Sequence, residues 1–186
     1  MSDLLTAAQE NALLKIARDA LTARVRGEKY ELPETNDPVM RRKRGAFVTL
    51  NVDGALRGCI GYPLPVEPLA ETVAEMAVAA ATQDYRFAPL RADELRRLRI
   101  EISALTLPEP IRDPGAIVVG RHGIIVSKGP SKGLLLPQVP VEHKWDRETF
   151  LRHGCLKAGL PEDEWKRGVQ IEVFEAQVFS EPEPSP

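Results

Sequence analysis

A cysteine and an arginine lie two positions apart in the stretch Leu56–Tyr62, which reads LRGCIGY. A thiolate is a nucleophile and a metal ligand, and a nearby guanidinium favours that ionised form. Gly58 and Gly61 flank Cys59, and glycine within a strand often marks a bulge or the close approach of a ligand or another backbone. Two interpretations stay open: Cys59 is a nucleophile activated by Arg57, or Cys59 is a small buried hydrophobic side chain.

Two other stretches place reactive side chains among glycines and prolines. His122 lies between Arg121 and Gly123 in the sequence GRHG, so a turn could present its imidazole, although a surface histidine without function is an equal alternative. Gln138 and Glu142 lie in the stretch LPQVPVE, which we expect to be a rigid, proline-flanked loop after a strand, and such loops often carry function. The alternative is a capping loop that leads Trp145 into the core.

The familiar signatures of metal and nucleotide sites are absent from the sequence. It contains no CxxC, HxxxH or HExxH motif, so the spacing of cysteines and histidines gives no support to a metal site. GxSxG, GxGxxG and the P-loop pattern are absent as well. We therefore predict no metal, and the sequence leaves the cofactor unknown.

Charge and length limit the function classes that remain. The 186 residues suit one domain, or one domain with a small lobe. The formal net charge of -2 provides no overall field that would attract nucleic acid or a membrane surface. The basic run Arg41–Arg44 is expected to be solvated in a loop, so nucleic acid is not an expected partner.

The two cysteines are too few for a disulfide framework. Residues 1–10 are polar and amphipathic, unlike a signal peptide, and no apolar run approaches the roughly 20 residues that a membrane span needs. We expect a cytoplasmic protein with reduced thiols.

The first elements are predicted in detail because their signals are local. Thr6 and Gln9 form a capping-box pattern before a helix that Gly27 would end. Strands over residues 46–52 and 55–61 are joined by Asp53-Gly54, a strong signal for a two-residue turn. Strict pairing from this turn sets Val48 opposite Cys59 and Leu50 opposite Arg57, so Cys59 is predicted on the same face as Arg57, Val48, Leu50 and Val52.

Later segments alternate between helical and strand-like patterns. The expected order is a helix after Pro68, a short helix at 92–95, a strand at 99–107, a loop at 108–114, short apolar runs at 117–119 and 123–126, a hairpin tip at 129–133 with a return at 134–136, a helix from Asp146 to about Ala158 that Gly159 ends, a strand at 169–179 and a disordered tail at 181–186. Hairpin-linked strands favour an α+β fold with a mostly antiparallel sheet flanked by helices.

With these stretches identified, the chain resembles the AMMECR domain family, called AmmeMemoRadiSam system protein A in microbes. The resemblance rests on six ordered blocks: residues 45–50 (GAFVTL), 56–61 (LRGCIG), 84–90 (DYRFAPL), 122–124 (HGI), 135–139 (LLPQV) with Glu142 and Trp145, and 157–160 (KAGL). LRGCIG is the hallmark of the family. Tyr62 and Tyr85 depart from the threonine and proline that the family often has there.

The resemblance implies one domain over residues 1–180 with a larger and a smaller lobe. It also implies a Memo-like protein and a radical SAM protein as partners, while the biochemical activity of the family is not established. The hypothesis that follows is a cleft lined by the LRGCIG and LLPQV motifs. Its candidate catalytic residues are Cys59, Arg57 and His122, and its candidate substrate- or partner-binding residues are Gly58, Gly61, Arg86, Gln138, Glu142 and Trp145.

Two alternatives stay open beside that hypothesis. The chain could be an interaction module without chemistry of its own, in which Gly58 and Gly61 permit close docking of a partner and Cys59 only packs. It could also be a nucleic-acid-associated regulatory protein that binds through Arg41–Arg44. Whether the protein is an enzyme is left undecided by the sequence.

Overall fold

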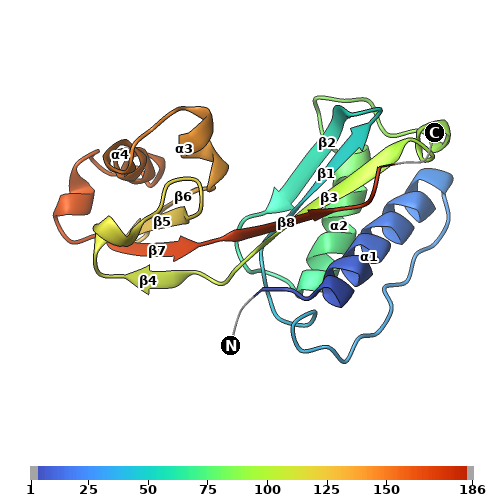
Figure 1. Ribbon diagram of the computed structural model, residues 1–186, viewed down its shortest axis with the longest axis horizontal. Coiled ribbons are helices and arrows are strands. Elements are labelled where there is room, and N and C mark those ends of the chain that lie inside the picture. The colour runs from blue at the N-terminus through green and yellow to red at the C-terminus, as the bar shows by residue number, and fades with distance from the viewer. Residues whose placement is uncertain (1–3, 184–186) are drawn as a thin grey trace. The chain divides into compact units, whose positions relative to one another are not determined.

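The computed structural model describes residues 4–183, which form two compact units (Figure 1). Of the described residues, unit 1 comprises 4–105 and 177–183, and unit 2 comprises Thr106–Ala176. Each unit contains helices and an antiparallel sheet of four strands. The predicted α+β class is confirmed, with two sheets where the sequence suggested one. The prediction of one two-lobed domain over residues 1–180 stays a prediction.

Unit 1 packs two long helices against one face of its sheet. The helices are α1 (Ala7–Arg26) and α2 (Leu69–Thr82), with a short 3-10 helix η1 (Ala92–Glu94). The strand order is β2-β1-β3-β8, where β1 is Ala46–Val52, β2 is Ala55–Tyr62, β3 is Leu98–Leu105 and β8 is Ala176–Ser180. Strand β2 is therefore an edge strand.

Local signals fix the boundaries of α1 and of the β1–β2 hairpin as predicted. The Thr6 hydroxyl accepts the backbone N–H of Gln9, and the Gln9 side chain accepts the backbone N–H of Thr6, which completes the capping box. Gly27 ends the helix with a φ of 74°. Asp53 and Gly54 both have positive φ, 52° and 77°, as a two-residue hairpin turn of type I′ requires.

The two faces of the unit 1 sheet differ in what covers them. In β1, the buried side chains of Ala46, Val48, Leu50 and Val52 alternate with half-buried ones. The buried face packs on α2, where residues such as Ala77 and Ala80 allow the helix to approach closely. We call the opposite face, which neither α1 nor α2 covers, the open face. It carries the half-buried side chains of Thr49 on β1 and Glu101 on β3.

The basic run Arg41–Arg44 is only partly the solvated loop that the sequence suggested. Arg44 is 1% exposed, and its Nε donates to the carbonyl oxygen of Leu105 at 2.7 Å. The prediction was wrong at this residue because the chain leaves the loop before Arg44 and enters the core beside the end of β3. Arg44 therefore stabilises the fold of unit 1, and three basic residues of the run remain exposed.

Unit 2 packs one helix against its own sheet. The strand order is β4-β7-β5-β6, where β4 is Glu109–Ile111, β5 is Gly123–Lys128, β6 is Ser131–Leu135 and β7 is Gln170–Phe174. The remaining elements are α3 (Gln138–Glu142), α4 (Arg147–Lys157), η2 (Pro114–Ala116) and η3 (Glu164–Lys166). The core joins Phe150, Leu151 and Cys155 of α4 to apolar residues of the sheet.

Asp146 and Gly159 bound the helix in unit 2 as predicted. The Asp146 side chain accepts the backbone N–H of Thr149 at 2.8 Å, and Gly159 has a φ of 73°. On the sheet side, a Cβ at Gly133 would lie 2.3 Å from the backbone nitrogen of Ala158. The absence of a side chain at Gly133 thus lets β6 lie directly against the end of α4.

Three predictions for the second half of the chain were wrong. The expected loop at 108–114 contains strand β4, and the expected rigid loop at 136–142 contains helix α3. The expected strand at 169–179 is two strands in different sheets, interrupted at Glu175. There the backbone N–H of Thr106 donates to the carbonyl oxygen of Glu175 at 2.9 Å. Alternation of polar and apolar residues shows that a segment is extended, but not which sheet it joins.

The last described residues remain attached to unit 1. Within the expected tail 181–186, Arg18 Nε donates to Glu181 Oε1 at 2.9 Å, and the N–H of Glu181 donates to the carbonyl oxygen of Ile100 at 2.9 Å. Residues 184–186 lie outside the described part of the chain. Among residues 4–183, none of the helices has the length and apolar character needed to cross a membrane.

Candidate functional site

Cys59 lies on the open face of the unit 1 sheet, opposite Thr49 on the neighbouring strand β1. Its side chain is half-buried, and the Thr49 hydroxyl donates to the Cys59 sulfur at 3.3 Å. Counting from the Asp53-Gly54 turn predicts Cys59 opposite Val48, on the face that packs against the helices. That register was wrong by one residue at this position, and the thiol is on the other face.

A β-bulge at Arg57 is the reason for the wrong register. Next to the turn, Val52 pairs with Ala55 and Asn51 with Leu56, as predicted, but Leu50 then pairs with Gly58. Arg57 is therefore an extra residue in β2 without a partner in β1. Because side chains alternate along a strand, one extra residue transfers every later side chain to the opposite face.

Gly58 lies inside the bulge and touches the backbone of α2. A Cβ at this position would lie 2.2 Å from the carbonyl oxygen of Ala80, a distance that no real Cβ contact shows. Glycine is therefore required here for the close approach of β2 to α2. Gly61 instead lies under the ring of Phe47, which a Cβ would meet at 2.4 Å.

Asp84 and Arg86 hold the backbone of Cys59 on the outer edge of β2. Asp84 Oδ2 accepts the backbone N–H of Cys59 at 2.9 Å, and Arg86 Nη2 donates to the carbonyl oxygen of Cys59 at 3.4 Å. Arg86 also donates from Nε to Asp84 Oδ1 at 2.9 Å and from Nη2 to Oδ2 at 2.7 Å. The pair occupies hydrogen-bonding groups that an edge strand would otherwise leave open.

The Asp84 carboxylate is deeply buried and its charge is stabilised by Arg86. Its side chain is 2% exposed, compared with 44% for Arg86. The hydrogen bonds from Arg86 are the largest cause that holds the pKa of Asp84 far below its usual range, and the N–H of Cys59 adds to the effect. Asp84 was absent from the predicted site because, in the sequence, it is only a polar residue after a helix. Its place at the head of the DYRFAPL block is the signal that could have identified it.

Arg57 is bound to another acidic residue and not to the thiol. Its Nε and Nη2 donate to the two carboxylate oxygens of Glu94 at 2.8 and 3.0 Å. Its Nη1 donates to the carbonyl oxygen of Ala88 at 2.6 Å, and Nη2 also reaches that of Pro89 at 3.3 Å. This two-point ion pair, with side chains 18% and 14% exposed, fixes the segment before η1 to the bulge.

His122 belongs to unit 2 and contacts Glu175. The backbone N–H of Val118 donates to His122 Nδ1 at 3.1 Å, so the neutral imidazole carries its proton on Nε2. Nε2 lies 3.8 Å from Glu175 Oε1, which also accepts Arg121 Nε at 2.9 Å. The imidazole is therefore oriented by two partners of its own unit.

Trp145 is the centre of a stack of three rings in unit 2. The ring of His153 on α4 lies 3.8 Å from that of Trp145 with an interplanar angle of 7°, and the ring of His143 lies 4.7 Å away at 17° on the same tryptophan. The stack leaves His153 half-buried. Gln138 and Glu142 are exposed at the two ends of α3.

The structure thus divides the nine predicted site residues between the units. Unit 1 holds five of them, namely Arg57, Gly58, Cys59, Gly61 and Arg86, of which Arg86 contacts Cys59 directly. Unit 2 holds His122, Gln138, Glu142 and Trp145. The structure adds Asp84 and Thr49 to the surroundings of the thiol.

The second cysteine has a very different environment from Cys59. Cys155 is fully buried in the core of unit 2, and burial raises the pKa of its thiol. A buried, un-ionised thiol packs as a small hydrophobic group. Within residues 4–183, no group of three or more histidine, cysteine or acidic residues is arranged to hold a metal ion.

Comparisons with known proteins agree with the resemblance seen in the sequence. The sequence model of the AMMECR1 family matches residues 14–179. Protein Mbar_A1807 of Methanosarcina barkeri is 44% identical over 97% of this chain and 94% of its own length, and Protein MK0488 of Methanopyrus kandleri is 47% identical over 99% and 94%.

A solved structure has a similar fold. The uncharacterized protein PH0010 from Pyrococcus horikoshii superposes with a TM-score of 0.72 at 43% identity, covering 92% of this chain and 91% of that protein. Identity and coverage at these levels assign the chain to one family. That family is the one expected from the LRGCIG block. This chain belongs to the AMMECR1 family.

Proposed function

We propose that this protein is a component of a modification system that also contains a Memo-like protein and a radical SAM protein, and that Cys59 is its working residue. One observation carries the proposal. The thiol is held at a defined position on the open face, since both backbone groups of Cys59 are bonded on the outer edge of β2, the N–H to Asp84 and the carbonyl oxygen to Arg86. A cysteine that only fills space needs no such orientation.

The chemistry available at this position is that of an oriented thiol. Cys59 would act as a nucleophile, or as a ligand that it shares with a partner protein. The cation that contacts Cys59 is Arg86, since Arg57 is occupied by Glu94. The Thr49 hydroxyl can donate to a thiolate and so stabilise its charge. We therefore assign to Arg86 the electrostatic role that the sequence suggested for Arg57.

The residues of unit 2 would serve recognition in this proposal. Gln138 and Glu142 are exposed on α3. Trp145, which stacks on His153 of α4, donates its backbone N–H to the carbonyl oxygen of Pro140 in α3 at 2.8 Å and so links the two helices. A short helix on a rigid support presents side chains at fixed positions. His122, oriented by Val118 and Glu175, is the candidate for proton transfer within unit 2.

Substitution of each cysteine tests the proposal. Cys59→Ser should abolish function in cells while capture of the Memo-like and radical SAM proteins is retained. Cys155→Ala is the matched control, because that thiol is buried in unit 2 and should be dispensable once circular dichroism shows a folded protein. Full function of Cys59→Ser would contradict the assignment of Cys59.

An interaction module is the second candidate, and one observation favours it. The guanidinium of LRGC already has a structural partner, because Arg57 donates to both carboxylate oxygens of Glu94. The motif would then shape a docking surface without chemistry. In that case Cys59→Ser and Cys59→Ala both keep function, whereas Gly58→Ala disturbs partner capture.

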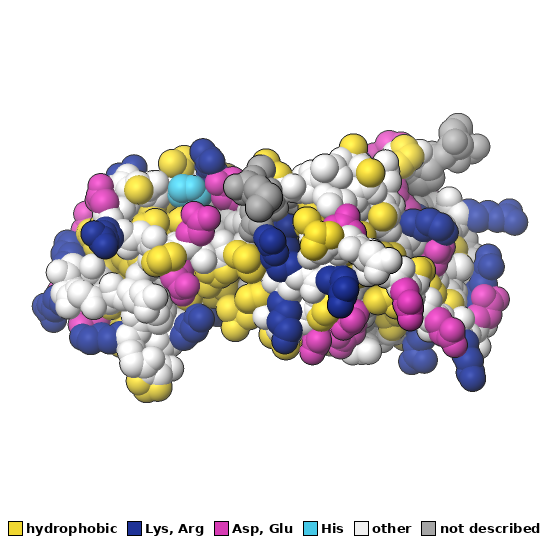
Figure 2. All heavy atoms as spheres, turned by 90° about the horizontal axis from the view of Figure 1, so that it is seen from below, with side chains coloured by type: hydrophobic (Ala, Val, Ile, Leu, Met, Phe, Trp, Pro, Cys, Tyr) yellow, Lys and Arg dark blue, Asp and Glu magenta, His cyan; other side chains and the backbone are white. Residues whose placement is uncertain are grey.

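Nucleic-acid binding has less support. Arg44 is buried, which leaves three exposed residues of the basic run, and Figure 2 shows Lys and Arg side chains interspersed with Asp and Glu side chains on one face. Binding through phosphates would weaken steeply with added salt. No binding of single- or double-stranded DNA or RNA at low salt would exclude it.

A further inference from the structure

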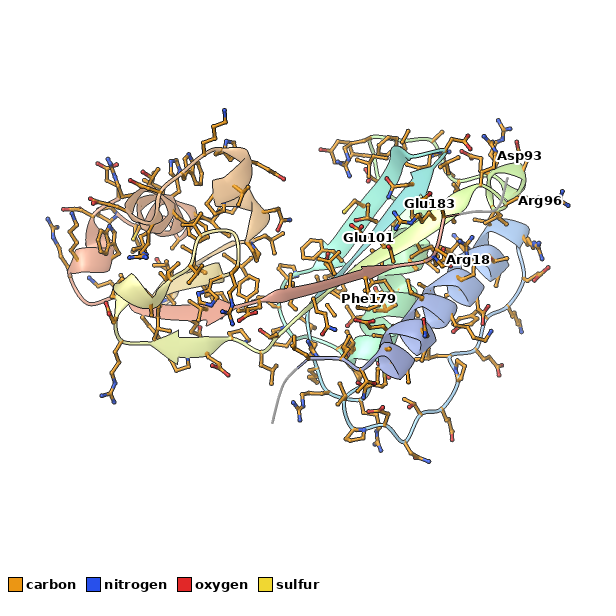
Figure 3. The ribbon with its side chains drawn as sticks, viewed as in Figure 1. Arg18, Asp93, Arg96, Glu101, Phe179 and Glu183 are labelled. Carbon is orange, nitrogen blue, oxygen red and sulfur yellow. The ribbon has the colours of Figure 1, made fainter. Side chains whose placement is uncertain are left out.

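Glu101 is a half-buried carboxylate in the same row of the open face as Cys59. In the register of the sheet, Cys59 on β2 lies opposite Thr49 on β1, and Thr49 lies opposite Glu101 on β3. Neighbouring strands are about 4.8 Å apart, so the Cα atoms of Cys59 and Glu101 are separated by about 10 Å. Figure 3 labels Glu101 on this sheet.

The charge of Glu101 is not neutralised by a neighbouring residue. Among residues 4–183, the Glu101 carboxylate takes part in no hydrogen bond or ion pair, although its residue is half-buried. Arg99, two residues earlier on the same face, is turned to the end of the chain: its Nε donates to the carbonyl oxygen of Glu181 at 2.8 Å and its Nη1 lies 3.4 Å from Glu183. A half-buried carboxylate without a partner is unfavourable unless a cation or water meets it.

The other charges near the thiol cancel in pairs. Asp84 and Arg86 form one two-point ion pair, and Arg57 and Glu94 form another. Among residues 4–183, Glu101 is thus the carboxylate in the row of Cys59 that no cation of the chain pairs with.

We propose that Glu101 is the residue that recognises charge at the Cys59 site. The site then takes a ligand with a cationic group, such as an ammonium or guanidinium. That group lies about 10 Å from the ligand atom that reacts with the thiol. The inference deepens the proposed function and rests on it, since it takes the Cys59 surface as the working site. Glu101 binds the cation directly, and Thr49 lies between it and the thiol on the same row.

Small thiol reagents of different charge test the inference without knowledge of the natural ligand. Three methanethiosulfonates are used, one with a trimethylammonium group, one neutral and one with a sulfonate group. In each reaction the Cys59 thiolate attacks the sulfenyl sulfur, a mixed disulfide forms and a sulfinate leaves. Peptide mass identifies modification at Cys59. The rate of each reagent at Cys59 is divided by the rate of the same reagent with 2-mercaptoethanol, which removes the intrinsic differences between reagents.

Glu101→Gln removes the charge and keeps the size of the side chain. A unit charge at this distance, partly screened by water, should change the ratio of the cationic to the anionic rate by about 3- to 10-fold. We therefore expect this ratio to be lower in Glu101→Gln than in the wild type by that factor. Glu71→Gln is the matched control, because Glu71 is exposed on α2, on the other side of the sheet, and its ratio should equal that of the wild type.

The outcomes separate this inference from the proposed function. If Cys59 of the folded protein fails to react with any of the reagents, the proposed function is overturned and this inference with it. If Cys59 reacts but the ratio is the same in Glu101→Gln and wild type, the inference alone is wrong. Should the variant not fold, the wild type decides: its normalised cationic preference must fall as sodium chloride is raised, and a preference that is absent or independent of salt overturns the inference.

Discussion

Replacement of Gly58 by alanine should destabilise unit 1 and disturb the position of the Cys59 thiol. The added Cβ would lie 2.2 Å from the carbonyl oxygen of Ala80 and 3.1 Å from its carbonyl carbon. Both atoms belong to the backbone of α2, so no side-chain rotation can relieve the contact. Either β2 or the end of α2 must move by about 1 Å, since interiors are close-packed.

The magnitude follows from the cost of inserting a methyl group into a packed region. Overpacking of this kind lowers the free energy of unfolding by about 1–3 kcal/mol. For a chain of this length, such a change lowers the midpoint of thermal unfolding by about 3–10 °C. Because Asp84 follows closely after the end of α2 and accepts the N–H of Cys59, the displacement should also change the reaction rate of the thiol.

Thermal unfolding followed by circular dichroism measures the first effect, and the rate of Cys59 alkylation measures the second. Gly54→Asn is the control, because Gly54 has a φ of 77°, which asparagine tolerates, and open space where a Cβ would lie. The control should stay within about 1 kcal/mol of the wild type. If Gly58→Ala unfolds at the wild-type temperature with an unchanged alkylation rate, the close approach of β2 to α2 is not what requires glycine.

Three further predictions concern the groups around the two candidate regions. Asp84→Asn should lower the free energy of unfolding at pH 7 by about 1–3 kcal/mol. Because the pKa of Asp84 is lowered in the folded chain, the wild type loses this stability as pH falls through about 5 to 2. Urea titrations should show a flatter pH profile for the variant, and equal profiles would refute the role of the ion pair. Glu94→Gln should weaken the fork with Arg57 and speed hydrogen exchange of the segment 88–94 by about 10-fold, corresponding to about 1.4 kcal/mol; unchanged exchange would show that the ion pair does not hold this segment. His153→Ala should expose Trp145 and shift its fluorescence to longer wavelength in a Trp165→Phe background, and an unchanged spectrum would mean that the stack does not form in solution.

The elements that the sequence predicts well are those with local signals. Thr6, Gly27 and the Asp53-Gly54 turn act through hydrogen bonds and backbone angles within a few residues. The family resemblance makes the class of the fold predictable as well, since six ordered blocks identify the AMMECR1 family from the sequence alone.

The glycines of LRGCIG are typical of a bulge, but its position at Arg57 could not be predicted, because the contacts that hold it are distant in the sequence. Arg57 is held by Glu94, and Gly58 lies against Ala80. Neither contact is visible in an alternating strand pattern, so counting from the turn placed the thiol on the wrong face. The same limit applies to Glu175, where one extended segment leaves one sheet and enters another.

Asp84 and Glu101 were missed for a related reason. In the sequence, Asp84 is a polar residue after a helix, and Glu101 is an outward-facing residue of an amphipathic strand. Only strand order and register bring the second into the row of Cys59 and Thr49, and only the path of the chain after α2 brings the first to the backbone of Cys59.

Alkylation of the native protein tests the central claim most directly, because the chain contains its own control. Iodoacetamide is applied to the folded protein at pH 8, a second, isotopically labelled iodoacetamide is applied after unfolding, and the peptides of Cys59 and Cys155 are compared by mass spectrometry. We predict that Cys59 carries the first label and Cys155, which is fully buried, carries the second. If both cysteines carry only the second label, Cys59 packs and does not react.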